Sequence, residues 1–258
     1  MNLDFLAVPM GMLVRLLYNM VSGIDSKYLS AYAISIIIST IIFKLAVLPL
    51  TLKQSKSMKK MQELSPKIQE LQEKYGKDPQ TLQRKQMELY KEANYSPFSG
   101  CLPLLIQFPI LIAFFYVIRD PVKYVFMDQE LFDTINRTFL WIKDLGFAEN
   151  HIFENGVVNG LSMGGMSLPF LGYALPVLAV ITGVITYLTT KMTAQPSLNE
   201  QQASTQRTMS MMMPIMIFVF SIQFPAGLAL YWVVSNLFQL VQQYIVLNSS
   251  KNPKEELK

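Results

Sequence analysis

Five runs of apolar residues, each about as long as a bilayer is thick, constrain this chain more than any other feature. An α-helix rises about 1.5 Å per residue, so about 20 apolar residues cross the roughly 30 Å hydrocarbon core of a membrane. Soluble cores do not need continuous runs of that length. The composition agrees, because 51% of the residues are hydrophobic and only 16% are charged. We therefore predict an all-α integral membrane protein.

The predicted organisation alternates membrane spans with polar connections. The five spans are placed at residues 28–52, 99–118, 168–190, 209–224 and 225–247, the last of which includes a tight turn at IQFPAG. The other segments are a helix at 1–27, a basic helical hairpin at 53–98, a loop at 119–167, a loop at 191–208 and a tail at 248–258.

Lysine and arginine residues predict the orientation of the spans. Residues 53–97 contain ten of them, whereas residues 119–167 contain four against seven acids. Since basic loops stay in the cytoplasm, the hairpin, the 191–208 loop and the C-terminal tail are predicted inside. The N-terminus and the 119–167 loop are then outside.

The N-terminal segment 1–27 is apolar but is interrupted by Pro9 and Arg15. We prefer an interfacial helix on the outer surface to a sixth span. No basic region precedes its apolar run, so we expect neither a secretory signal nor a lipoprotein-type leader.

The basic connection at 53–98 has its own helical pattern. Its apolar stripe, at spacings of three and four, consists of Met61, Leu64, Ile68, Leu71 and Tyr75. Gly76 is a C-cap candidate, and Asp78 followed by Pro79 predicts the start of a second helix. The hairpin either packs only on itself or also recruits a partner or lipid headgroups. The basic residues of that recruitment region are Lys59, Lys60, Lys67, Lys74, Arg84 and Lys85.

Lys44 is the most informative residue, because it lies inside the first span, about 12 Å from its cytoplasmic end. A charge at that depth costs about 2.5 to 3.5 kcal/mol and normally faces protein or water. The alternative is that its long stem lies along the helix while the ammonium reaches the interface. Thr40 and Thr51 share its helix face and favour a polar stripe.

Other spans contribute polar residues but no acid that could neutralise Lys44. They are Gln107, Thr182, Thr186, Thr189, Thr190, Ser235, Asn236 and Gln239. A cation among neutral hydrogen-bonding groups needs water, so we predict a hydrated cavity open to the cytoplasm. Each threonine can instead bond to its own helix backbone.

Several chemistries are disfavoured by residue counts. Cys101 is the only cysteine, and His151, the only histidine, lies in the predicted outer loop. These counts exclude a histidine-based triad and any multi-histidine or multi-cysteine metal site. No glycine-rich phosphate loop is present. We predict no enzyme activity, no metal and no cofactor. Basic residues flank apolar runs, so lipid headgroups rather than nucleic acid are the expected counter-charge.

Three stretches resemble the YidC family of membrane protein insertases. They are FKLAVLPLTLKQSKSMKKMQELSPKIQELQEKYG, NYSPFSGCLPLLIQFPILIAFFYVI and FPAGLALYWVVSNLFQLVQQYIV. The resemblance covers most of the chain from Tyr28 onward. It implies the compact five-helix bacterial form, without a large outer domain or an extra first span, which has relatives in mitochondria and chloroplasts.

The resemblance also implies a function in the bacterial plasma membrane. Such insertases accept hydrophobic segments of newly made proteins from the cytoplasm and release them into lipid without nucleotide hydrolysis. The implied partners are nascent membrane proteins and the bilayer, and the hairpin is expected to meet the ribosome, a Sec translocon or targeting machinery.

Lys44 stands where the family usually carries an arginine, in a hydrophilic groove closed toward the outside. A lysine keeps the charge but loses the planar fork that grips a carboxylate with two bonds. The expected groove residues are Lys44, Thr40, Gln107, Thr186, Thr190, Trp232, Ser235 and Asn236.

Two other functions stay open on the residues alone. In a small transporter or channel, Lys44 would bind an anion, although five unequal spans show no two corresponding halves. In a membrane scaffold, the hairpin would recruit a partner and Lys44 would only reach the interface.

Overall fold

The computed structural model describes residues 4–96, 102–149, 151–154, 157–161, 166–167, 174–193 and 200–248. In these ranges the α-helices are α1 (Asp4–Val21), α2 (Ala31–Tyr75), α3 (Pro79–Glu92), α4 (Leu102–Arg119), α5 (Gln129–Thr134), α6 (Val177–Thr193), α7 (Glu200–Gln223) and α8 (Ala226–Asn248). A 3-10 turn, η1 (Ser22–Ile24), follows α1, and a π-helical turn, η3 (Val122–Phe126), follows α4.

Two small antiparallel sheets, which were not predicted, accompany the predicted helices. Strand β1 (His151–Glu154) pairs with β2 (Val157–Leu161), and β3 (Met166–Ser167) pairs with β4 (Ala174–Leu175). In the sequence, β1 and β2 are separated by Asn-Gly and are rich in β-branched and aromatic residues, which is the usual signal for a hairpin. The strands lie in the predicted 119–167 loop and just after it.

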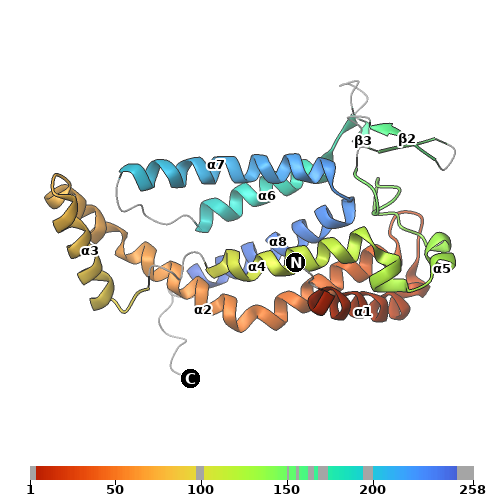
Figure 1. Cartoon of the computed structure of the whole chain (residues 1–258), viewed down its shortest axis with the longest axis horizontal. Coiled ribbons are helices and arrows are strands. Elements are labelled where there is room, and N and C mark those ends of the chain that lie inside the picture. The colour runs from red at the N-terminus through yellow and green to blue at the C-terminus, as the bar shows by residue number, and fades with distance from the viewer. Residues whose placement is uncertain are drawn as a thin grey trace.

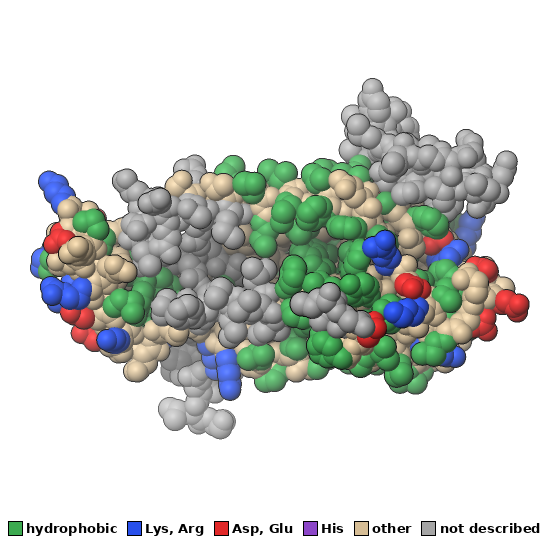
Figure 2. Space-filling view, viewed as in Figure 1, with side chains coloured by type: hydrophobic (Ala, Val, Ile, Leu, Met, Phe, Trp, Pro, Cys, Tyr) green, Lys and Arg blue, Asp and Glu red, His purple; other side chains and the backbone are tan. Residues whose placement is uncertain are grey.

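The long helices lie side by side along the long axis of the molecule (Figure 1). Helix α3 is at one end, whereas α5 and the strands are at the opposite end. Figure 2 shows apolar side chains over the middle of this face and charged side chains gathered at both ends. The main core joins α1, α2, α4, η3 and α8, and its largest fully buried side chains include Tyr32, Tyr231, Phe114, Phe126 and Met10.

Helix α2 is one continuous helix of 45 residues, where the sequence analysis placed a span ending at 52 and a separate hairpin beginning at 53. The Ser30 hydroxyl caps its start by accepting a hydrogen bond from the Ala33 amide at 3.1 Å. Hydropathy changes sharply after Leu52, but the following residues are good helix formers, so the helix does not end. Pro49 and Pro66 both lie inside it.

The predicted helical hairpin forms from the second half of α2 and from α3. Met61, Leu64 and Ile68 pack with Tyr90 and Tyr95, whereas Leu71 and Tyr75 are only half-buried. The start of α3 is as predicted, because Asp78 accepts a hydrogen bond from the Thr81 amide at 3.2 Å and Pro79 is in the first turn. Gly76 does cap α2, but in a right-handed helical conformation, with φ at −58°.

Length and hydropathy alone qualify two described stretches as membrane spans, Asp4–Ile24 and Ala31–Tyr75. Shorter apolar helices occur at Gln107–Arg119, Val177–Met192 and Ser210–Gln223. The N-terminal segment is therefore, like α2, long and apolar enough to cross a membrane. Its placement on the outer surface stays a prediction. Helix α7 begins at Glu200, before the predicted span start at 209, and α6 begins at Val177, after the predicted start at 168.

Replacing Ile68 with alanine is expected to loosen the hairpin, because Ile68 is fully buried between α2 and α3. Removing its side-chain carbons should lower the local free energy of unfolding by about 2 kcal/mol. Hydrogen exchange of the α3 amides in the full chain measures this. The exposed neighbour Gln69 supplies the control Gln69→Ala, and equal exchange in both variants would contradict the packing argument.

Candidate functional site

Lys44 lies in the apolar half of α2, and its ammonium reaches across to α4. Lys44 Nζ donates a hydrogen bond to Gln107 Oε1 at 3.1 Å. The side chain is half-buried, and no carboxylate lies within ion-pair distance of it in the described part of the chain. The ammonium is therefore held between two helices by a neutral partner.

Gln107 also forms a hydrogen bond with α8. Its Nε2 donates to the Tyr231 hydroxyl at 2.7 Å, and the Ser235 side chain is a further hydrogen-bond partner of that hydroxyl. Tyr231 is 1% exposed and stacks on Phe114 of α4, with ring centroids 4.1 Å apart. Lys44 and Gln107, which were predicted for one groove, contact each other directly. Tyr231, which the prediction omitted, connects Gln107 to the predicted groove residue Ser235.

The sequence did contain a signal for Tyr231. Tyr231 and Ser235 are four residues apart on a helix, so their side chains lie on one face. The prediction chose Trp232, the neighbour of Tyr231, from the family resemblance alone.

Trp232 takes part in a second contact, between α8 and α6. Its Nε1 donates to the Thr186 hydroxyl at 3.1 Å, and that hydroxyl in turn donates to the Thr182 carbonyl at 2.7 Å. This pair joins two of the predicted groove residues. Among the described residues, neither of these two hydrogen bonds involves Lys44.

The remaining predicted groove residues bond to their own helices. The Thr40 hydroxyl donates to the Ile36 carbonyl, the Thr190 hydroxyl to the Thr186 carbonyl, and Asn236 Nδ2 to the Trp232 carbonyl. This is the local alternative noted for the threonines. Thr40 is almost fully buried one turn before Lys44, so it adds polarity near the ammonium without a hydrogen bond to it.

A second polar seam, not predicted as a site, joins α2 and α8 nearer the hairpin. Gln242 Oε1 accepts from the Thr51 hydroxyl at 3.0 Å, and Gln242 Nε2 donates to the Ser55 hydroxyl at 3.1 Å. Two buried amide groups, Gln54 Nε2 and Gln243 Nε2, have no hydrogen-bond partner. The polar interior therefore extends from Lys44 toward the hairpin end of the bundle.

The basic residues predicted for recruitment lie on the hairpin, and several contact neighbours there. These contacts are Lys60 Nζ with the Asn94 carbonyl at 3.5 Å, Lys85 Nζ with Glu88 at 2.7 Å, and Lys74 Nζ above the Tyr75 ring at 5.4 Å. The hydrogen bond that Lys85 donates to the Glu88 carboxylate raises the pKa of Lys85. Lys67 and Arg84 are exposed and Lys59 is half-buried, so the hairpin presents positive charge to solvent.

The groups around Lys44 can bind a charged or polar segment. Among the described residues, no group of three histidine, cysteine, aspartate or glutamate side chains could hold a metal ion. What Lys44 and its neighbours offer is one positive charge with neutral donors and acceptors from α2, α4 and α8. Such a set can attract an anionic group or solvate a polar chain.

Replacing Tyr231 with phenylalanine is expected to destabilise the bundle by about 1 to 3 kcal/mol, because Gln107 loses a buried acceptor. Tyr32→Phe is the matched control, since the Tyr32 hydroxyl is buried without a partner. Its removal should leave stability unchanged or raise it. Thermal unfolding in detergent compares the two, and an equal loss in both variants would contradict the assignment.

Comparisons with known proteins identify the family to which the chain belongs. The family model described as 60Kd inner membrane protein matches residues 24–254. The membrane protein insertase YidC of Clostridium perfringens is 37% identical over 249 residues, which cover 95% of this chain and 92% of that protein. This chain belongs to the YidC family of membrane protein insertases.

Other YidC proteins and one crystal structure agree. The protein of Fusobacterium nucleatum is 35% identical over 86% of this chain and 88% of its own length. The chain is also similar to a crystallised active YidC insertase with its first transmembrane domain resolved, at a TM-score of 0.58 and 31% identity over 93% of this chain. It spans 46% of that crystallised chain and 33% of the YidC of Pelodictyon phaeoclathratiforme, so some members are much longer.

Proposed function

We propose that this chain inserts hydrophobic segments of newly made proteins into the bacterial plasma membrane from the cytoplasm, through a hydrated, positively charged groove around Lys44. The observation that carries this is the placement of Lys44, held by Gln107 and, through it, by Tyr231, with no carboxylate nearby among the described residues. Family membership supports the general function.

The groove lowers the cost of moving polar groups. Each buried unpaired polar group costs several kcal/mol in hydrocarbon, about 2 to 7 by transfer measurements. An incoming chain that rests its polar outer segment against Lys44 and the α2–α8 seam keeps those groups solvated. Its apolar stretch meanwhile stays against lipid. Because the barrier falls through solvation, no nucleotide hydrolysis is needed.

The proposed topology has five spans, formed by α4, α6, α7, α8 and the apolar half of α2. Helix α1 lies on the outer surface, the N-terminus is outside and the C-terminus is in the cytoplasm. Three features support it. The basic hairpin and α5, which belongs to the acidic 119–167 loop, are at opposite ends of the molecule, and apolar side chains lie between them. Helix α8 packs along α2, and α6 packs along α7 and α8.

The hairpin of α2 and α3 is proposed as the receiving region for the ribosome, a Sec translocon or targeting machinery. Its small core of Met61, Leu64, Ile68, Tyr90 and Tyr95 keeps it folded beyond the apolar part of α2. The exposed basic residues Lys67 and Arg84 offer charge to acidic partners or anionic lipid.

Insertion of a one-span test protein into liposomes containing only this purified chain tests the function. Protease protection above that of empty liposomes, without added nucleotide, is expected. No protection with any substrate would overturn the proposal. Salt-dependent anion flux without protection would instead favour the transporter.

A further inference from the structure

The start of α6 is capped by a residue far away in the chain. The first amides of any α-helix lack partners inside the helix, and the Ala-Leu-Pro sequence before α6 has no side-chain acceptor. The Glu149 carboxylate supplies one from 29 residues upstream. It accepts from the Leu178 amide at 2.9 Å and from the Ala179 amide at 3.3 Å. A carboxylate there also complements the positive end of the helix dipole.

Glu149 is itself held in place. Its Oε1 accepts a hydrogen bond from Trp141 Nε1 at 2.6 Å, and Trp141 packs against the main core. The carboxylate therefore bridges an indole and a helix start.

The segment around Glu149 also binds the outer ends of α2 and α8. We call residues 136–149 the outer clasp. Its Thr138 carbonyl accepts from the Ser30 amide at the start of α2, and Leu140 donates to the Tyr28 carbonyl. At α8, the Leu145 and Phe147 carbonyls accept from the Gly227 and Ala226 amides at 2.9 and 2.7 Å. One short segment thus joins three helices.

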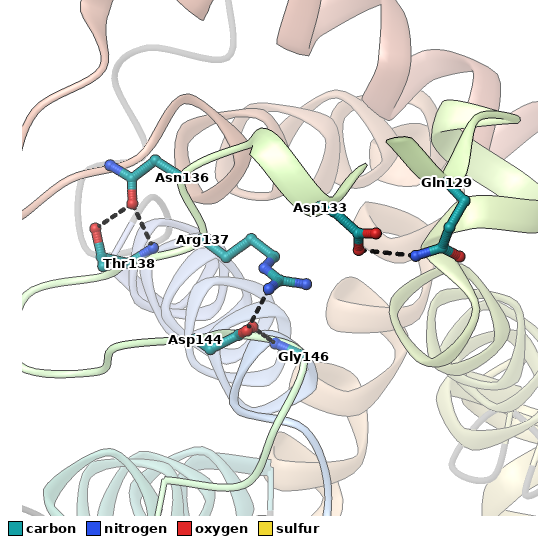
Figure 3. A network of polar contacts seen from close by, with 7 residues as sticks. All are labelled: Gln129, Asp133, Asn136, Arg137, Thr138, Asp144 and Gly146. Carbon is teal, nitrogen blue, oxygen red and sulfur yellow. Dashed lines mark hydrogen bonds and ion pairs between the residues drawn. The ribbon is translucent and has the colours of Figure 1, made fainter. Parts of the chain in front are cut away.

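An ion pair stiffens the middle of the outer clasp (Figure 3). Arg137 Nη2 lies 2.9 Å from Asp144 Oδ2, and Asp144 Oδ1 accepts from the Gly146 amide at 2.8 Å. Burial raises the pKa of the Asp144 carboxyl, whereas the Gly146 amide and Arg137 oppose that rise. Asn136 fixes the start of the segment, since its side-chain oxygen accepts from the Thr138 amide and hydroxyl.

We propose that Glu149 is a positioning residue that ties α6 to the outer clasp and thereby keeps the groove closed to the outside. This rests on the proposed function and topology. Among the described elements α6 packs mainly on α7 and α8, and near its C-terminal end its Met192 carbonyl accepts a hydrogen bond from Gln62 Nε2 of α2 at 3.2 Å. At the outer end, the Glu149 carboxylate links α6 to the segment that also holds α2.

Cysteine accessibility tests the proposal in the full chain. Thr182 is fully buried one turn inside α6, so Thr182→Cys, in a Cys101→Ser background, reports opening near the cap. A membrane-impermeant maleimide is added to sealed right-side-out vesicles. With Glu149→Ala we expect labelling from the outer side to rise about tenfold, which matches the loss of a helix cap. Glu149→Gln keeps one acceptor oxygen and should give a smaller rise.

Two controls separate this from general loosening. Glu130→Ala removes an exposed carboxylate of α5 and should change nothing. A Ser39→Cys reporter, equally buried in α2, should stay unlabelled with Glu149→Ala. If Glu149→Ala does not accumulate, Glu149→Gln carries the comparison.

Unchanged outer labelling of Thr182→Cys in Glu149→Ala or Glu149→Gln would overturn the proposal, as would an equal rise at Ser39→Cys. Insertion by the parent chain is measured separately in inside-out vesicles, whose cytoplasmic face is accessible to an added substrate. Its absence would count against the proposed function, whereas the labelling results address Glu149 alone.

Discussion

Replacing Lys44 with alanine is expected to lower insertion of substrates with acidic outer tails about tenfold, while substrates with neutral tails are inserted almost as before. A tenfold effect needs an attraction of only about 1.4 kcal/mol, which is modest for charges a few ångströms apart in a partly desolvated groove. Lys44 is well placed for this, because the partner of its ammonium among the described residues is the neutral Gln107. Protease protection in liposomes measures insertion for matched pairs of substrates.

Lys44→Arg should retain most of the activity, because it keeps the charge and adds a planar fork for carboxylates. The control is Lys56→Ala, which removes an exposed lysine of the same helix in its polar half. Equal losses for acidic and neutral tails in Lys44→Ala would show that the charge does not act on the substrate. Equal losses of insertion in Lys56→Ala and Lys44→Ala would show that the effect does not depend on the position of the lysine in α2.

Replacing Gly11 with alanine is expected to destabilise the protein by more than about 3 kcal/mol, although alanine favours helices. Gly11 faces η3 so closely that a Cβ atom built on it would lie 2.0 Å from the Tyr124 carbonyl oxygen and 2.6 Å from its carbon. Both are backbone atoms and cannot rotate away. Helix α1 or η3 must therefore shift, which breaks the packing of Ala7, Met10 and Val14.

Gly23→Ala is the matched control, since no atom lies within 4 Å of a Cβ at that position. It should change stability by less than about 0.5 kcal/mol. Thermal unfolding in detergent and protease cleavage near α1 compare the two variants. Equal melting temperatures would show that α1 packs more loosely on η3 than described.

Features with local causes could be predicted from the sequence. The cap at Asp78, the first-turn Pro79 and the Met61, Leu64 and Ile68 stripe follow from residue types at fixed spacings, and the structure contains all of them. The depth of Lys44 inside an apolar run likewise marked it as unusual. Its pairing with Gln107, 63 residues away, could only be expected from a family resemblance.

Features that depend on distant contacts were missed. Glu149 was counted only as one acid of an outer loop, because its partners at 178 and 179 are invisible to local spacing. Tyr231 was overlooked beside Trp232, although its spacing of four residues from Ser235 is visible in the sequence. The β1–β2 hairpin had a local Asn-Gly signal that the weight given to membrane helices concealed. The unbroken α2 was missed because hydropathy reports the environment of a helix and not its ends.

Because α2 is unbroken, a tilt about its outer end would move its two ends by different amounts. Its 45 residues span about 68 Å, and its first turn is fixed at the outer clasp through Ser30. A tilt of about 5° about that fixed end would move the far tip about 6 Å but Lys44 only about 2 Å, because Lys44 is about 20 Å from the pivot. A displacement that a partner imposes on the hairpin is therefore smaller at Lys44 than at the tip of α2. Under the proposed function and topology, a force applied to the hairpin in the cytoplasm would become a small displacement of Lys44, the charge proposed to meet the incoming chain.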